Sequence, residues 1–70
     1  MTESVYKIIE LVGTSPTSWE EAAKAAVEKA SQSLRELRIA EVNKLDMKVE
    51  NGKVTAFRAR VTLSFKYGSD

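Results

Sequence analysis

Residues 11–23 read Leu-Val-Gly-Thr-Ser-Pro-Thr-Ser-Trp-Glu-Glu-Ala-Ala, and this stretch decides the fold because it joins an apolar strand to a long helix. The strand comes first: residues 5–12 are mostly apolar, and many of their side chains are β-branched or aromatic. Gly13 closes this run, so we predict a first strand over residues 5–12 with most of both faces covered.

Two serines compete to cap the helix that follows. Ser15 precedes Pro16, which suits the first turn of a helix. Ser18 and Glu21 form an S-x-x-E capping box, in which the two side chains satisfy two backbone N–H groups. Either cap contributes about 1 kcal/mol, so the sequence predicts that the helix begins at one of these two serines.

The helix is marked by apolar residues that recur at three- and four-residue spacing. They are Trp19, Ala23, Ala26, Val27, Ala30, Leu34 and Leu37. This inner face is mostly alanine, which fills little volume and allows a close approach to a sheet. Neither glycine nor proline interrupts residues 17–51, but helical spacing changes to alternation near residues 37–38, so we predict that the helix ends there.

Two alternating runs follow, joined by Asn51 and Gly52. In the first, residues 44–49 alternate between polar and apolar side chains, which predicts a strand of about ten residues. In the second, residues 55–67 place most apolar side chains at odd positions and most polar ones at even positions. Asn-Gly between such runs is a strong hairpin signal, because both central positions of a type I′ turn need positive φ.

The order of these elements predicts one α+β domain over residues 1–70 with β-α-β-β topology. We expect a three-stranded, largely antiparallel sheet packed on one amphipathic helix. A right-handed crossover returns the first strand beside the third, which leaves the first and second strands at the edges. Two free edges on so thin a layer favour association between subunits.

Composition excludes several classes of function. The chain has 70 residues and a net charge of +1, which gives no basic surface for nucleic acid. No apolar run approaches the roughly 20 residues that span a bilayer, and residues 1–4 do not resemble a signal peptide, so we expect a cytoplasmic protein without a membrane partner. So small a core, without cysteine, favours oligomerisation. Without histidine, the hydroxyl side chains at 14–18 lack a general base, so we do not expect an enzyme.

Three segments, taken in order, resemble the dodecins. They are Val-Tyr-Lys-Ile-Ile-Glu-Leu-Val-Gly-Thr-Ser at 5–15, Ala-Glu-Val at 40–42 and the alternating strand that ends at Tyr67. The resemblance covers nearly the whole chain. It implies a hollow homododecamer of β-α-β-β protomers that stores or sequesters a flavin, FMN or riboflavin, at subunit interfaces without catalysing a reaction.

The resemblance also implies two ligand-binding positions. In flavin-binding members a tryptophan before the Ala-Glu-Val segment stacks on the isoalloxazine ring, and a glutamine on the third strand binds its pyrimidine edge. Here these positions hold Ile39 and Arg58. Isoleucine offers no flat π surface, which removes roughly 1–3 kcal/mol of stacking, and arginine donates hydrogen bonds but accepts none. Both departures predict a weak affinity for flavin.

A cation is the alternative ligand. The Arg-Ile-Ala-Glu-Val segment at 38–42 is similar to a dodecin-like branch that lacks the stacking tryptophan, and some of those shells are associated with calcium. The resemblance identifies no metal ligands. Oxygen ligands occur along the second strand at Glu41, Asn43, Asp46 and Glu50, although alternate residues point to opposite faces. A calcium-stabilised dodecameric scaffold without flavin is therefore the second hypothesis.

Three further interpretations concern single features. Trp19 could line a ligand pocket, but its place at the start of the apolar stripe favours an anchor in the core or an interface. Arg58, Arg60 and Lys66 share one strand face, which suits a phosphate-bearing ligand or a solvated surface. The free sheet edges allow a third hypothesis, an adaptor that captures peptides by strand addition.

Overall fold

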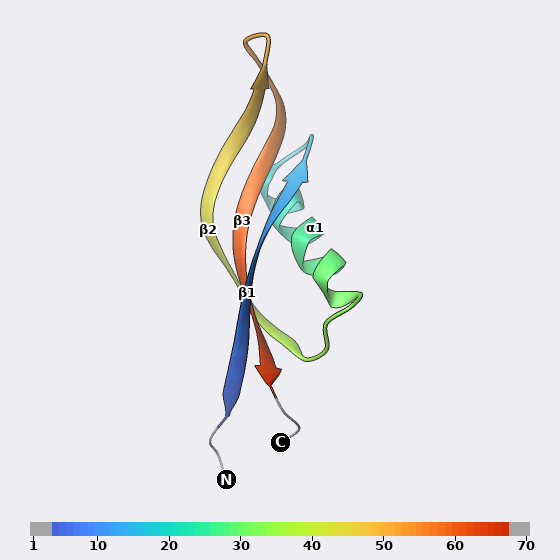
Figure 1. Ribbon diagram of the computed structural model, residues 1–70. Helices are drawn as coiled ribbons and strands as arrows, with labels where there is room; N and C mark the ends of the chain where they lie inside the picture. Colours follow the sequence, from blue (N-terminus) through green and yellow to red (C-terminus); the bar gives the residue numbers. More distant parts are fainter. Residues whose placement is uncertain (1–3, 68–70) are drawn as a thin grey trace.

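The computed structural model describes residues 4–67, and its elements follow the predicted order β-α-β-β (Figure 1). They are β1 (Val5–Ser15), α1 (Trp19–Ser31), β2 (Leu37–Glu50) and β3 (Lys53–Tyr67). The strands form one antiparallel sheet in the order β1-β3-β2, which confirms the α+β prediction and places the first and second strands at the edges. The molecule measures 55 × 20 × 14 Å, and α1 covers only the middle of this long sheet.

The helix begins at Trp19 because Ser18 caps it. The backbone of Ser18 is extended, and its Oγ accepts a hydrogen bond from the N–H of Glu21 at 3.1 Å. The Oγ of Ser15 instead accepts a hydrogen bond from the N–H of Thr17 at 3.0 Å, which stabilises the turn before the helix. Of the two predicted caps, the second is correct.

The helix ends earlier than predicted. α1 stops at Ser31 with Gln32 as its C-cap, and β2 begins at Leu37. Leu34 and Leu37 do pack against the core, but they reach it from the turn and from the strand. Their spacing from Ala30 continues the helical stripe, so the apolar pattern alone does not reveal the break.

A turn over residues 32–36 makes this break without glycine or proline. Glu36 occupies the left-handed region with φ of 59°, and its carbonyl oxygen accepts a hydrogen bond from the N–H of Lys66 at 3.0 Å. This bond joins the turn to the far end of β3. Because the helix stops early, β2 has 14 residues rather than the predicted ten or so.

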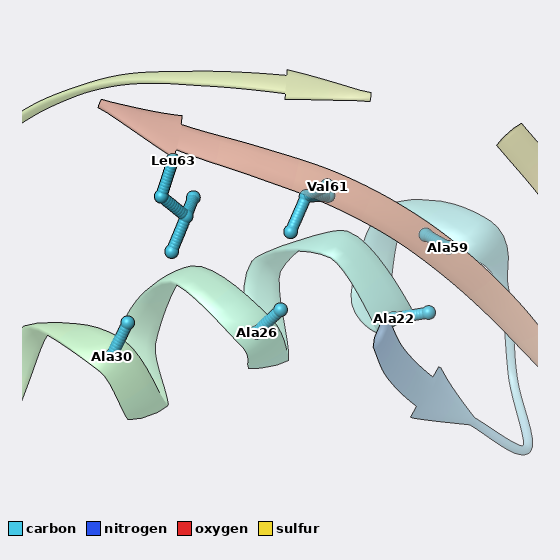
Figure 2. Close-up of a cluster of buried hydrophobic side chains, with 6 residues drawn as sticks. All are labelled: Ala22, Ala26, Ala30, Ala59, Val61 and Leu63. Atoms are coloured by element: carbon cyan, nitrogen blue, oxygen red, sulfur yellow. The ribbon is translucent and has the colours of Figure 1, made fainter. Parts of the chain in front are cut away.

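The core lies between α1 and the middle of β3, where Figure 2 shows alanine side chains of the helix and apolar side chains of the strand pointing towards one another. Its buried residues are Ala22, Ala26, Ala30, Ala59, Val61 and Leu63. The three from β3 confirm the apolar face predicted for that strand. The alanines confirm the predicted close approach, although the line that is buried runs through Ala22, while Ala23 of the predicted stripe is only half-buried.

Gly13 lets the helix lie directly on β1. A Cβ atom at this position would collide with the carbonyl oxygen of Ala22 and would lie 3.0 Å from the Cβ of Ala26. The glycine does not close the strand as predicted, since β1 continues through it to Ser15 and pairs it with Ala59 of β3.

Asn51 and Gly52 form the predicted hairpin turn between β2 and β3. Their φ values of 53° and 75° are both positive, as a type I′ turn needs. The hairpin projects beyond the helix (Figure 1), and every residue of β2 after Leu37 is exposed. The single chain therefore leaves both faces of β2 largely uncovered.

Candidate functional site

The sheet has one face covered by α1 and one face left open. Strand register places residues from all three strands in rows across the open face. β3 contributes Arg58, Arg60, Thr62, Ser64 and Lys66 to it. The basic residues predicted to share a strand face do so, and Ile39 joins them because it is the register partner of Ser64.

Arg58 makes a two-point ion pair with Asp46, its register partner on β2. The Nε of Arg58 donates to Asp46 Oδ1 at 2.7 Å, and a terminal guanidinium nitrogen donates to Oδ2 at 2.8 Å. These hydrogen bonds raise the pKa of Arg58 and hold the pKa of Asp46 below its ordinary value of 3.8. The guanidinium therefore binds the neighbouring strand in the isolated protomer, and sequence reasoning missed this partner.

Ile39 lies far from Arg58 within one protomer. Its side chain is 56% exposed on the open face beside Ser64. The stretch of β3 from Arg58 to Ser64 spans roughly 20 Å at about 3.3 Å per residue. One chain therefore does not bring the two predicted ligand positions together, and a ligand touching both would need residues from a second subunit.

A row of oxygen atoms crosses the open face at Thr62. Glu10 on β1 and Glu41 on β2 are the register partners of Thr62. Asn43 sits at a register shift in β2, and its Oδ1 accepts a hydrogen bond from Thr62 Oγ1 at 2.7 Å. We name Glu10, Glu41, Asn43 and Thr62 the oxygen row. It combines carboxylate, amide and hydroxyl oxygens, which are the ligands that hard cations prefer.

The acidic residues predicted along β2 divide between different partners. Asp46 is bound by Arg58, and Glu50 lies 3.5 Å from the Nζ of Lys48. No group of three or more histidine, cysteine or acidic residues within 4–67 could hold a metal ion.

Glu10 was not singled out from the sequence, because only the pairing of β1 with β3 brings it to the oxygen row. Its position in an apolar strand, facing away from the helix, was the available signal.

Trp19 is anchored across the sheet. Its Nε1 donates to the carbonyl oxygen of Asp46 at 3.0 Å, and its ring meets that of Phe57 edge-on, with centroids 5.2 Å apart. Trp19 therefore ties the start of α1 to β2 and β3, as expected of an anchor, and it also lines a cavity, as the other interpretation allowed. Beside it lies a cavity of about 440 Å³, lined by Trp19, Glu20, Ala23, Val42 and Leu45.

A three-stranded sheet with one helix on one face and polar rows on the other defines a class of small α+β proteins that present an open sheet surface. The Dodecin family model matches residues 5–68 of this chain. The protein belongs to the dodecin family. α1, the helix of the described residues, is too short to cross a bilayer.

Relatives of this family show which members the chain resembles. It is 50% identical over 64 residues to calcium dodecin of Mycobacterium tuberculosis, an alignment that covers 90% of this chain and 89% of the relative. The crystal structure of that calcium dodecin, described as having a novel calcium-binding site, superposes with a TM-score of 0.82, 46% identity and 96% coverage of both chains. Dodecin from Streptomyces coelicolor superposes with a TM-score of 0.91, 34% identity and full coverage of both chains.

Proposed function

We propose that this dodecin is a non-enzymatic binding protein that assembles with copies of itself into a hollow dodecameric shell and binds calcium between subunits. The exposure of β2 carries the proposal. Side chains that are 47–58% exposed on this strand are Ile39, Val42, Leu45, Met47 and Val49. Contact with further copies buries such an apolar strand and gives this small domain the core that one chain lacks.

The oxygen row supports calcium as the ligand. Ca²⁺ takes about six to eight oxygen ligands, preferably with several carboxylates. One protomer offers the carboxylates of Glu10 and Glu41 with the side-chain oxygens of Asn43 and Thr62. A second subunit facing this surface supplies the remaining ligands. The similarity to calcium dodecin of M. tuberculosis supports the same choice.

Flavin storage, the other ligand that the family resemblance implies, has less support on this chain. Ile39 offers no aromatic surface to an isoalloxazine ring. Arg58 lies on the open face of the sheet, but Asp46 accepts two hydrogen bonds from its guanidinium group. A flavin would have to break this ion pair and find its stacking partner elsewhere.

Calcium titration by calorimetry, combined with sedimentation velocity, tests the proposal. We expect saturable binding of Ca²⁺ by a large assembly, and a lower melting temperature after treatment with EDTA. The paired substitutions Glu10→Gln and Glu41→Gln should weaken Ca²⁺ binding at least about tenfold, because each removes a charged ligand. Glu50→Gln is the matched control, since this carboxylate lies near Lys48 at the hairpin and should leave binding unchanged.

Each result has a separate meaning. A monomer at all concentrations contradicts the shell. An assembly that binds no Ca²⁺ retains the shell but removes calcium from the proposal. Equal losses in Glu10→Gln, Glu41→Gln and Glu50→Gln would show a general charge effect and would contradict the oxygen row as the site.

A further inference from the structure

On the side of the sheet where α1 lies, two apolar areas extend beyond the reach of the helix. The first is the cavity between the start of α1 and β2, which we name the Trp19 cavity. The second lies beyond the other end of the helix, where residues 5–8 of β1 pair with residues 64–67 of β3 (Figure 1). We name this segment the terminal ribbon; Ser64 and Phe65 within it also pair with the start of β2.

The Trp19 cavity is preformed and carries one charge at its edge. Val42 and Leu45 form its strand wall and are about half exposed, at 49% and 51%. Trp19 cannot fold into the cavity, because its hydrogen bond to Asp46 and its contact with Phe57 hold the ring in place. Glu20 lines the cavity, and within residues 4–67 no ion pair engages its carboxylate.

The terminal ribbon has the complementary chemistry. Val5 and Tyr67 are register partners, and their side chains are 62% and 61% exposed. Lys7 lies on the same face, with its Nζ 6.0 Å from the centroid of the Tyr67 ring. The ribbon therefore presents exposed apolar and aromatic side chains with a positive charge beside them.

We propose that the terminal ribbon of one copy docks in the Trp19 cavity of the next, with Tyr67 inside the cavity and Lys7 opposite Glu20. An aromatic ring suits a cavity of about 440 Å³ with apolar walls, and the two charges are opposite. This inference identifies two surfaces that meet in the proposed shell, and it rests on the proposal that the protein assembles.

The contact must join two copies. Leu45 in the cavity wall is the register partner of Ala59, and the stretch of β3 from Ala59 to Tyr67 spans roughly 26 Å at about 3.3 Å per residue. One chain cannot fold its own ribbon into its own cavity, because the two lie at opposite ends of the stretch of β3 that runs past the helix as one continuous strand (Figure 1). The two surfaces that meet are different, so the contact is heterologous. Repeating it from copy to copy gives a ring when the rotation between successive copies closes.

A charge-swap experiment tests this pairing. Lys7→Glu and Glu20→Lys should each weaken self-association at least about tenfold in sedimentation equilibrium, because each places like charges together. The double variant Lys7→Glu/Glu20→Lys restores opposite charges and should associate within about threefold of the original chain. Glu21→Lys is the matched control: it makes the same change in the first helical turn, but Glu21 does not line the cavity.

A cavity-filling variant provides an independent test. Ala23 lines the open cavity, so Ala23→Phe occupies the space from within. We expect far-UV circular dichroism to stay native and self-association to fall. The emission of Trp19, the single tryptophan, should shift to shorter wavelength as the original chain associates and should lose this concentration dependence in Ala23→Phe.

The outcomes separate this contact from the proposed shell. If the original chain is monomeric, both the proposed shell and the ribbon contact are wrong. If it assembles, and the single charge reversals and Ala23→Phe assemble equally well, the shell stands and the ribbon contact is wrong. A small apolar ligand or an unrelated peptide that shifts Trp19 emission without changing the oligomeric state would assign the cavity to that occupant and overturn the contact.

Discussion

At the scale of single residues, Asp46 on β2 forms an ion pair with Arg58 on β3, so the charge of its carboxylate affects how well the two strands are held together. Its exposed carboxylate accepts two hydrogen bonds from Arg58 on β3, which lower its pKa below 3.8. Because the pKa of Asp46 is lower in the folded than in the unfolded protein, its ion pair with Arg58 stabilises the fold at pH values above the unfolded-state pKa of this carboxyl group. This contribution is lost as the pH falls through the lowered folded-state pKa.

Asp46→Asn should therefore destabilise the protein at neutral pH, and the difference from the original chain should shrink as the pH falls below about 3.8. Urea unfolding followed by circular dichroism at several pH values measures this difference. Glu50→Gln is the control, because its partner Lys48 lies at 3.5 Å in an exposed single contact. A difference for Asp46→Asn that stays constant down to strongly acidic pH would contradict the argument.

Ile39 sets the affinity for flavin in our interpretation. The original chain should not quench riboflavin fluorescence at micromolar concentration, whereas Ile39→Trp should bind at least about fivefold more tightly, since base–aromatic stacking contributes roughly 1–3 kcal/mol. Ile8→Trp is the control, because Ile8 has the same 56% exposure on the same face at the other edge. Quenching by the original chain would show that another aromatic residue replaces the missing one.

The sequence identified single residues well where their role is local and poorly where it depends on a distant partner. Trp19 makes the anchoring contacts that its place in the stripe favoured. The partnership of Arg58 with Asp46 and the convergence of Glu10 with Glu41 depend on strand register. Register is set by the whole sheet and its irregularities, so spacing along the chain did not reveal these pairs.

At the scale of elements, α1 lies so close to β1 at Gly13 that a side chain there would have no room. Gly13→Ala places a Cβ against the Ala22 carbonyl and forces the helix away from the sheet. We expect this substitution to cost about 3 kcal/mol of unfolding free energy, as overpacking does. Gly52→Ala should cost only about 1 kcal/mol, since its Cβ meets nothing within 4 Å and only the positive φ is strained. Chemical unfolding compares the two variants, and equal losses would refute the close-approach argument.

The start of the helix and the hairpin turn were more predictable than the end of the helix. Ser18 and Asn51-Gly52 act through backbone bonds within a few residues, so their signals are visible locally. The end of α1 has no such signal, because Glu36 adopts a left-handed conformation that usually belongs to glycine. A backbone hydrogen bond from Lys66, at the far end of the chain, satisfies the carbonyl of this turn.

At the scale of the whole molecule, the long sheet is only partly covered by its helix. We therefore expect the melting temperature to rise with protein concentration, because association stabilises the folded state by mass action. Scanning fluorimetry over a hundredfold range of concentration measures this effect. Val42→Lys should lower the melting temperature most at high concentration, whereas the exposed helix substitution Lys24→Gln should not. A melting temperature independent of concentration would contradict assembly.

The overall topology was predictable because it follows from element order and the handedness of the crossover. The two free edges were predicted for the same reason. What the pattern could not give was the extent of the sheet beyond the helix at both ends (Figure 1). That extent depends on the early end of α1, which lengthens β2 and leaves more of it without a covering element.

The pairing of the first strand with the last also determines when each part of the chain finds its partner. β2 reaches β3 through a two-residue turn, but Val5 of β1 lies opposite Tyr67, so these strands meet only across nearly the full chain. Closing a long loop costs more entropy than closing a short one, so the hairpin should form first. During translation β1 leaves the ribosome before β3 exists, so its apolar side chains and its unpaired backbone N–H and C=O groups are exposed to the strands of neighbouring nascent chains.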